Sequence, residues 1–309
     1  MKIAFMGTPD FAVECLHALA LSEHEVVGVF CQPDKPVGRK QELTPPDVKV
    51  EALKHNLRVF QPATLRNGKG VEILEEIKPD LVVVVAYGKI LPPDFLRYPK
   101  YGCINIHASI LPKYRGASPI HFAVLNGDNE TGVTAMQMDD GLDTGDILRV
   151  KKAPIGLNDT TERMYEVLAP LGAEVLLETL DLLIKGELNP IKQDDSLSSK
   201  VGLLTKDMSP IDWTKSAFEI HNKIRGLYSW PGASTLLNGK TLKVHSSVLS
   251  DKNGNNIPGE IIENNGRIIV ACGDNNTIEL KTIQLEGKKR MDAGAFLNGY
   301  NLEKGTVLG

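Results

Sequence analysis

The sequence predicts an α/β protein in two parts, an open and mostly parallel sheet flanked by helices, followed by a small β-barrel. Over its first half, the 309-residue chain alternates short apolar strand patterns with helical patterns, which is typical of a parallel sheet covered on both faces. Residues 80–86 form a continuous apolar run, as in a strand buried on both sides. The last hundred residues hold short strand patterns separated by Asn-Gly pairs, the strongest hairpin signal.

The elements of the first part follow from their apolar periodicity. A long amphipathic helix at Thr160–Lys185 ends this part, with Asp159 or Thr160 as its N-cap and Gly186 as its stop. The expected elements before it are strands at Lys2–Met6, Glu25–Phe30, Asp80–Ala86 and Cys103–His107, and helices at Phe11–Leu21 and Val71–Ile77.

Residues 189–208 are polar, rich in Ser and Asp, and without periodicity, so we interpret them as a linker. This gives domains at 1–188 and 209–309, and a length of 309 residues favours two domains. The second domain is expected to hold one helix within Ile211–Gly226. Its expected strands are Thr235–Leu237, Leu242–Leu249, Gly259–Glu263, Arg267–Ala271 and Thr277–Leu285, with Asn-Gly at 238–239, 253–254 and 265–266.

Composition limits the possible classes of protein. No apolar run reaches the length of a membrane span, and the N-terminus lacks a signal-type segment. The four cysteines are scattered, and no histidine cluster has ligand spacing, so we expect reduced thiols, a cytoplasmic protein and no metal site. The net charge is −4, although residues 209–309 carry 12 of the 35 Lys and Arg and only 10 of the 39 Asp and Glu. This small asymmetry permits an RNA contact in the second domain.

A catalytic constellation is predicted at the end of the strand 103–107. Side chains alternate along a strand, so Asn105 and His107 point the same way while their apolar neighbours face the core. Strand ends are where open α/β sheets bind ligands. Asp143 lies on a Gly-flanked loop that could bring it to the imidazole, and Asp146 is a competing candidate. An amide, an imidazole and a carboxylate around one centre suit acyl-group chemistry, because they can stabilise a developing oxyanion.

These residues belong to longer blocks that resemble a known family. The run N-I-H-A-S-I-L-P-K-Y-R-G-A-S-P at 105–119 and G-L-D-T-G-D at 141–146 are similar to the folate-dependent formyltransferases. K-I-A-F-M-G-T-P-D-F at the N-terminus, V-V-A-Y-G-K-I-L-P at 84–92, I-D-W at 211–213 and Y-S-W-P-G-A at 228–233 resemble the branch that acts on tRNA. The resemblance implies a Rossmann-like first domain and an OB-like second domain. It also implies that Asn105, His107 and Asp143 are catalytic.

The same resemblance implies the substrates. The donor would be 10-formyltetrahydrofolate, consumed as a co-substrate, and the acceptor would be the amino group of methionine on initiator methionyl-tRNA, for translation initiation. The implied folate-binding residues are Tyr87, Gly88, Ile90, Leu91, Ser109, Ile110, Leu111 and Pro112. For residues 109–112, the alternative interpretation is an ordinary strand-to-helix connection.

The residues expected near tRNA are basic. Residues 31–49 form a long loop containing Pro and Gly, the kind that often binds ligands, and a mobile surface loop of mixed charge is the alternative. The expected tRNA contacts are Arg39, Lys40, Lys206, Arg225, Lys240 and Lys243. The run at 288–290 is also basic, but Glu286 and Asp292 dilute it, and charge runs are usually solvated faces.

Other functions remain open at this point. A formyltransferase acting on a small amine, such as an amino sugar nucleotide or glycinamide ribonucleotide, would use the same motif. So would a hydrolase that releases formate from formyl-folate. A non-catalytic RNA-binding module is disfavoured, because Asn105, His107 and Asp143 are all present. We expect a monomer.

Overall fold

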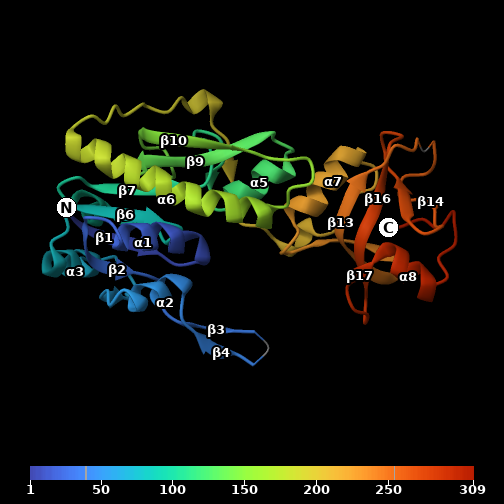
Figure 1. The fold of residues 1–309 in the computed structure, drawn as a ribbon, viewed down its shortest axis with the longest axis horizontal. Helices are drawn as coiled ribbons and strands as arrows, with labels where there is room; N and C mark the ends of the chain where they lie inside the picture. The colour runs from blue at the N-terminus through green and yellow to red at the C-terminus, as the bar shows by residue number, and fades with distance from the viewer. Residues whose placement is uncertain (39, 254) are drawn as a thin grey trace. The chain divides into compact units, whose positions relative to one another are not determined.

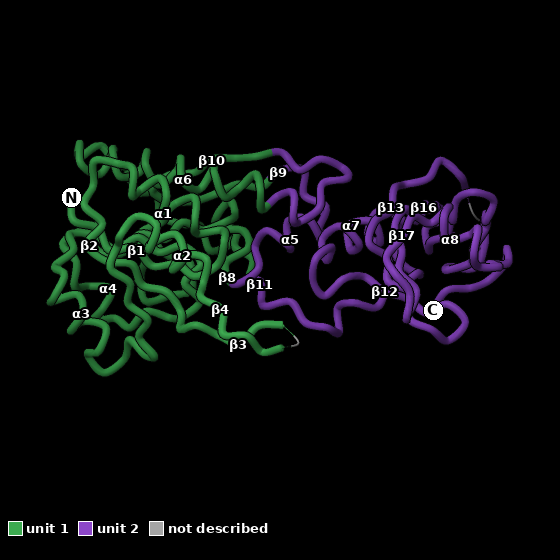
Figure 2. The backbone as a smooth tube through the Cα atoms, turned by 60° about the horizontal axis from the view of Figure 1, so that its bottom comes forward, with its two compact units in different colours: residues 1–116, 131–153, 165–200 green, residues 117–130, 154–164, 201–309 purple. Residues whose placement is uncertain are grey.

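The computed structural model describes residues 1–38, 40–253 and 255–309. Arg39, an expected tRNA contact, and Gly254, part of an Asn-Gly pair, lie outside the described residues. The chain divides into two compact units (Figure 2). Unit 1 comprises 1–116, 131–153 and 165–200, and unit 2 comprises 117–130, 154–164 and 201–309.

Unit 1 is built on a seven-stranded sheet in the order β10-β9-β7-β6-β1-β2-β5 (Figure 1). Strand β1 pairs in parallel with β2 and β6, as do β2 with β5 and β6 with β7, whereas β7 pairs antiparallel with β9. The strands are β1 Lys2–Gly7, β2 Glu25–Phe30, β5 Val59–Phe60, β6 Leu81–Val85, β7 Cys103–His107, β9 Glu130–Gln137 and β10 Ile147–Pro154. The predicted mostly parallel α/β sheet is confirmed. All five residues of β6 are buried, which explains their uninterrupted apolar run.

Helices connect these strands and complete the core. They are α1 Val13–Ala20, α2 Asp47–Lys54, α3 Lys69–Ile77, α4 Pro93–Arg97 and α6 Thr161–Lys185, with 3₁₀ turns at Asp10–Ala12 and Asp195–Leu197. A further 3₁₀ turn, Lys206–Met208, belongs to unit 2. Thr160 caps α6, because its hydroxyl oxygen accepts the N–H of Arg163 at 3.2 Å. The helix ends as predicted at Gly186, whose φ of 68° suits a residue without a Cβ.

The expected loop at 31–49 contains a β-hairpin and the start of a helix. Strands β3 Lys35–Val37 and β4 Glu42–Thr44 pair antiparallel, and the hairpin projects from unit 1 (Figure 1). All six residues are exposed, so the hairpin has no buried face. The sequence therefore carries no apolar alternation there that could have predicted strands.

Unit 2 contains a six-stranded antiparallel sheet with the order β12-β13-β16-β15-β14, and β17 paired to β16. Its strands are β12 Ala233–Leu237, β13 Lys240–Leu249, β14 Ile261–Glu263, β15 Ile268–Ala271, β16 Thr277–Leu285 and β17 Met291–Asp292. Its helices are α5 Pro119–Leu125, α7 Ala217–Gly226 and α8 Ala293–Gly299. The short strands β8 Arg115–Gly116 and β11 Lys200–Val201 pair with each other in a separate sheet. Helix α7 starts later than the predicted segment, because Ser216 and Glu219 form a reciprocal capping box.

The segment 305–309 joins the two ends of this sheet. Beside β14, Ile261 donates its N–H to Thr306 and Leu308 donates its N–H to Gly259, at 2.8 and 2.9 Å. On its other side, Gly309 donates its N–H to Leu236 of β12 at 3.1 Å. The sheet is thereby closed around an apolar core, in agreement with the predicted small β-barrel. Within the described residues, no helix is long and apolar enough to cross a membrane.

Candidate active site

The carboxyl ends of neighbouring parallel strands bring the predicted site residues to one edge of the sheet in unit 1. Strand β6 leads into Tyr87 and its partner β7 ends at His107. The main-chain carbonyl of Tyr87 accepts the Thr8 hydroxyl at 3.0 Å, just after β1, and the Gln32 amide at 3.1 Å, just after β2. The ends of β1, β2 and β6 are thus tied together beside the end of β7, in the position where open α/β sheets bind ligands.

Asn105, His107 and Asp143 lie together. Asn105 Nδ2 is 3.4 Å from Asp143 Oδ1, and His107 Nδ1 is 3.8 Å from Asp143 Oδ2. The imidazole is buried and Asn105 is half-buried. The competing carboxylate of Asp146 is on an exposed residue. The geometry therefore groups an amide, an imidazole and one carboxylate, which is Asp143.

A main-chain carbonyl orients the imidazole. His107 Nε2 lies 3.0 Å from the carbonyl oxygen of Tyr114, which can only accept, so Nε2 carries a proton. Tyr114 has a φ of 61° and its N–H donates to the Ser199 hydroxyl at 2.9 Å, which fixes that carbonyl in turn. The ring nitrogen that faces Asp143 is therefore Nδ1.

The Asp143 loop is held by several backbone contacts. Asp143 has a φ of 53°, and its Oδ2 accepts the N–H of Gly116 at 2.8 Å. A Cβ on Gly145 would lie 1.7 Å from the carbonyl oxygen of Gln137, so only glycine fits there. The Gly residues of the G-L-D-T-G-D block thus serve the close packing of the loop that carries the carboxylate.

Gln193 is a site residue that the sequence analysis missed. It is 7% exposed, and its Nε2 donates to the carbonyl oxygens of Asp143 and Gly145 at 2.9 and 2.7 Å. Its Oε1 accepts from Nε and Nη2 of the buried Arg115, at 3.0 and 2.8 Å. Gln193 belongs to the polar segment 189–208, where it differs from its exposed neighbours only by being buried. Burial of a single polar residue cannot be read from one sequence.

The two expected folate segments follow β6 and β7. Ser109 and Leu111 are buried, and the Thr134 hydroxyl donates to the Ser109 carbonyl and accepts the Leu111 N–H. The Leu111–Pro112 peptide bond is cis. Ile110 and Pro112 are partly exposed. These contacts fix the backbone of a loop whose donors and acceptors would suit a planar heterocycle.

The residues expected in the apolar wall differ in exposure. Tyr87 and Leu91 are buried in a core cluster, Gly88 is exposed with a φ of 82°, and Ile90 is 83% exposed. Burial raises the pKa of Tyr87 to about 12, and its hydroxyl is buried with no hydrogen-bond partner among the residues described. A buried donor without a partner costs free energy, which a ligand acceptor would recover.

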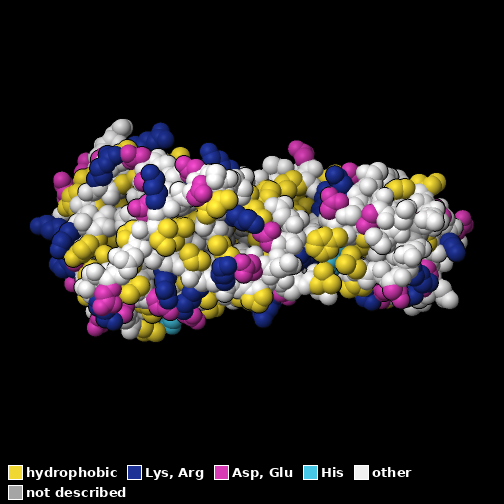
Figure 3. Space-filling view, turned by 90° about the horizontal axis from the view of Figure 1, so that it is seen from above, with side chains coloured by type: hydrophobic (Ala, Val, Ile, Leu, Met, Phe, Trp, Pro, Cys, Tyr) yellow, Lys and Arg dark blue, Asp and Glu magenta, His cyan; other side chains and the backbone are white. Residues whose placement is uncertain are grey.

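The basic residues expected near RNA also differ. Lys40 is exposed in the turn of the β3–β4 hairpin, and Lys206 is exposed in unit 2. Lys240 and Lys243 are exposed on β13, and the Lys288–Arg290 run follows β16, the strand that pairs with β13. On the face drawn in Figure 3, basic and acidic side chains are interspersed. The exposed basic residues thus form small local groups on a surface of mixed charge.

Arg225 is not available as a surface charge. It is 4% exposed, its Nε donates to Asn222 Oδ1 at 2.8 Å, and its Nη1 donates to the carbonyl of Asp159 at 2.9 Å. Burial lowers its pKa. These contacts lie inside unit 2, and they speak against Arg225 as an RNA contact because its charge is buried. The sequence showed the charge of this residue but not its burial.

Comparisons with known families cover nearly the whole chain. The model described as "Formyl transferase" matches residues 1–180, and the model described as "Formyl transferase, C-terminal domain" matches residues 203–301. The chain is 47% identical over 309 residues to a methionyl-tRNA formyltransferase of Alkaliphilus oremlandii, with full coverage of both chains. It is also 47% identical to the enzyme of that name from Citrifermentans bemidjiense, covering 100% of this chain and 96% of the relative.

Solved structures share the fold at lower identity. An N-formyltransferase from Helicobacter canadensis, in complex with folinic acid and dTDP-3-aminofucose, has a TM-score of 0.71 at 23% identity, covering 91% of this chain and 98% of that one. A sugar 3N-formyl transferase with dTDP and 5-N-formyl-THF has a TM-score of 0.70 at 24% identity, covering 94% and 99%. At such identities these structures support the fold alone.

Proposed function

This chain belongs to the formyl transferase family, as its sequence motifs predicted, and we propose that it is a methionyl-tRNA formyltransferase. It transfers the formyl group of 10-formyltetrahydrofolate to the amino group of methionine on initiator methionyl-tRNA, for translation initiation. The observation that carries this proposal is the 47% identity to enzymes of that name along the full chain. The sugar-modifying proteins of similar fold are 23–24% identical.

In the proposed reaction, the amino nitrogen attacks the formyl carbon and the carbonyl oxygen becomes an oxyanion. We assign Asn105 Nδ2 and His107 Nδ1 as the donors for this oxygen; both atoms lie within 4 Å of the Asp143 carboxylate. Collapse of the tetrahedral intermediate breaks the bond between the formyl carbon and N10 of the folate. The proton lost by the amine passes to N10 through water.

The hydrogen bond to Tyr114 determines the protonation state that this role requires. Because Nε2–H donates a hydrogen bond to the Tyr114 carbonyl, Nδ1 can donate only when His107 is a cation. The Asp143 carboxylate lies 3.8 Å from Nδ1, on the side of the ring where that cation would carry its second N–H. Its distance from Nδ1 exceeds that of a hydrogen bond, so Asp143 acts here as a charge, while Tyr114 sets the ring orientation.

We assign folate binding to the two segments that follow β6 and β7, with Tyr87, Gly88, Ile90 and Leu91 in one and 109–112 in the other. The cis Leu111–Pro112 bond and the Thr134 contacts support a preformed loop there. For tRNA, we retain Lys40, Lys206, Lys240 and Lys243, which are exposed, together with Arg39 from the sequence. We propose that the protein is a cytoplasmic monomer, and that its own side chains carry out the transfer without a metal ion.

A transfer assay with competing acceptors tests this function. The full chain would be given 10-formyltetrahydrofolate and one of three acceptors: initiator methionyl-tRNA, elongator methionyl-tRNA or an amino sugar nucleotide. We expect formylation of the initiator tRNA, with much slower transfer to the others. Preferential transfer to the sugar nucleotide would move the chain to the small-amine branch. Folate turnover without any formylated acceptor would indicate hydrolysis.

A further inference from the structure

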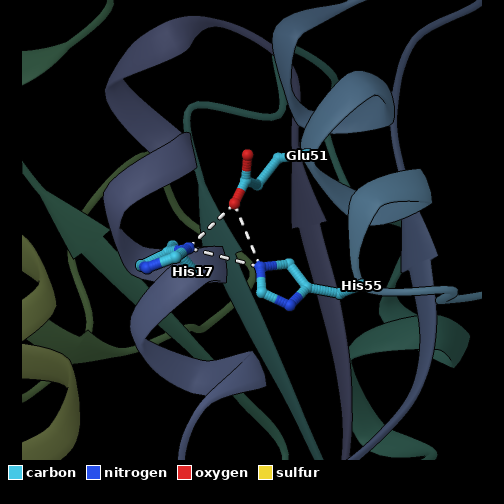
Figure 4. Close-up of side chains that lie close together, drawn as sticks. All are labelled: His17, Glu51 and His55. Carbon is cyan, nitrogen blue, oxygen red and sulfur yellow. Dashed lines mark hydrogen bonds and ion pairs between the residues drawn. The ribbon is translucent and has the colours of Figure 1, made fainter.

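His17, Glu51 and His55 bring three ligand atoms together on two helices of unit 1 (Figure 4). Glu51 Oε1 lies 2.8 Å from His17 Nδ1 and 3.1 Å from His55 Nε2, and the two ring nitrogens are 3.2 Å apart. His17 belongs to α1, Glu51 to α2, and His55 caps α2. The sequence concealed this cluster, because 34 residues separate His17 from Glu51.

Protons alone cannot satisfy all three contacts. The two ring nitrogens offer one proton each at this point, and an ionised carboxylate offers none. If both nitrogens donate to Glu51 Oε1, two N–H groups face each other across 3.2 Å. If one nitrogen instead donates to the other, the acceptor nitrogen faces the carboxylate oxygen with lone pair against lone pair. A cation at the centre of the three atoms removes this conflict.

We propose that His17, Glu51 and His55 bind a divalent transition metal ion, with Zn²⁺ as the best match. Imidazole nitrogen and carboxylate oxygen are ordinary zinc ligands at about 2.0–2.1 Å, and a tetrahedron of that size has edges of about 3.3 Å. The observed edges of 2.8–3.2 Å need only small adjustments. Two histidines and one glutamate fill three positions and leave the fourth to water.

The surroundings of Glu51 fit a ligand that binds through one oxygen. Its second oxygen, Oε2, accepts from Lys54 Nζ at 2.9 Å, which leaves Oε1 for the metal. The contact with Lys54, followed by that with His17, lowers the pKa of Glu51 to about 2, so the carboxylate is ionised at neutral pH. The side chain of Lys54 is 65% exposed, so water can screen its charge when a cation binds.

The hollow next to this cluster is acidic. It measures about 340 Å³ and is lined by Glu51 and Lys54 together with Asp10, Glu14 and Asp47. Four carboxylates against one ammonium give a negative potential that attracts cations. The side chains of His17 and His55 are 48% and 21% exposed, so a hydrated ion can reach them directly. A bound ion would cross-link α1 to α2, the helix that follows the β3–β4 hairpin.

Zinc titration of the chelator-treated full chain tests the proposal. By isothermal titration calorimetry we expect one equivalent of Zn²⁺ to bind, and the melting temperature to rise with zinc concentration by mass action. Cobalt in place of zinc should give the visible spectrum of a tetrahedral N/O site. The buried thiols should not compete, since burial raises the pKa of Cys15 and Cys103 to about 12.

Matched variants assign the binding to these residues. H17A and H55A should each weaken zinc binding by more than the ~10–100-fold that typically follows loss of an outer-shell partner. E51Q, which keeps the shape and removes the charge, should do the same. H24A also removes one histidine from unit 1, outside the cluster, and should bind zinc normally. Absence of a stoichiometric site in the unaltered chain, or equal affinity in folded H17A and H24A, would overturn the proposal.

Discussion

Gln193 donates its side-chain amide to the main-chain carbonyl of Asp143 over 2.9 Å. A second N–H of the same amide reaches the Gly145 carbonyl, and Arg115 holds the amide oxygen. The carboxylate that faces His107 is therefore positioned by a side chain about fifty residues farther along the chain. Because Gln193 touches only the backbone of the loop, its effect on the reaction is through geometry.

Replacing Gln193 by alanine should misplace the Asp143 loop. A displacement of the order of 1 Å in a catalytic group can cost ~10²-fold in rate, so we expect kcat to fall ~10–10²-fold with a smaller change in KM for folate. Loss of these buried hydrogen bonds should also cost about 1–3 kcal/mol of stability. Steady-state kinetics and thermal melts measure both effects. The neighbouring Lys192 is exposed, so K192A is the matched control, and an unchanged kcat in Q193A would refute the positioning role.

Removing either oxyanion donor should abolish most of the chemistry. Loss of one such donor typically costs ~10²–10³-fold in kcat, so N105A and H107A should fall in this range while remaining folded. D143A should show a loss of similar size, whereas D146A should retain most activity, because the Asp146 side chain is exposed. Single-turnover formyl transfer separates these losses from product release. A severe defect in D146A with normal D143A would transfer the role to Asp146.

The catalytic residues could be predicted because the signal is local. Asn105 and His107 are two residues apart on one strand, and β7 has the predicted bounds. The site residues that were missed act through tertiary contacts. The carbonyl of Tyr114 turns the imidazole, Gln193 anchors the Asp143 loop, and neither has a pattern in the sequence that marks this role.

The fold shows the same division. Long buried elements such as β6 and α6 were predicted, since burial imposes periodicity on their residues. The β3–β4 hairpin and the closing segment 305–309 were missed. The hairpin has no buried face, and the closing segment pairs with strands whose proximity is fixed only by the completed barrel.

Two exposed lysines on β13 should contribute to tRNA affinity. K240A and K243A should each raise KM for tRNA, and each should reduce the slope of log K against log salt by ~1, because one phosphate contact fewer releases fewer counterions. The kcat at saturating tRNA should hardly change. Lys281 on the neighbouring strand β16 is paired with Glu279, so K281A is the control. Salt slopes identical in all three variants would remove β13 from the RNA surface.

Arg225 should behave differently from these lysines. Its guanidinium is buried and hydrogen-bonded to Asn222 and to the carbonyl of Asp159. R225A leaves these acceptors unpaired, so we expect a loss of about 1.5–3 kcal/mol or more in the free energy of unfolding. Urea denaturation measures this loss. A stable R225A with a reduced salt slope for tRNA would restore the residue to the RNA surface.

His121 should make the protein sensitive to acid. Burial lowers its pKa from 6.5 to about 4 in the folded state. Between these values the unfolded chain binds a proton that the folded chain does not, so stability falls as pH decreases from 6.5 to 4. The loss is at most about 3 kcal/mol, because each tenfold change in proton affinity corresponds to about 1.4 kcal/mol. In thermal melts across this range, the wild type should lose stability relative to H121F as the pH falls, and parallel curves would contradict the assignment.

The seam formed by residues 305–309 sets an order on folding during synthesis. The outer edge of strand β14 takes its main-chain partners from residues 305–308, whereas Ser234 of β12 already pairs with Ser209 and Ile211. Until residues 305–308 are made, the edge of β14 is open to pairing with another chain. The barrel of this protein is therefore most exposed to aggregation just before its synthesis reaches the seam, and holding chaperones would protect it at that stage.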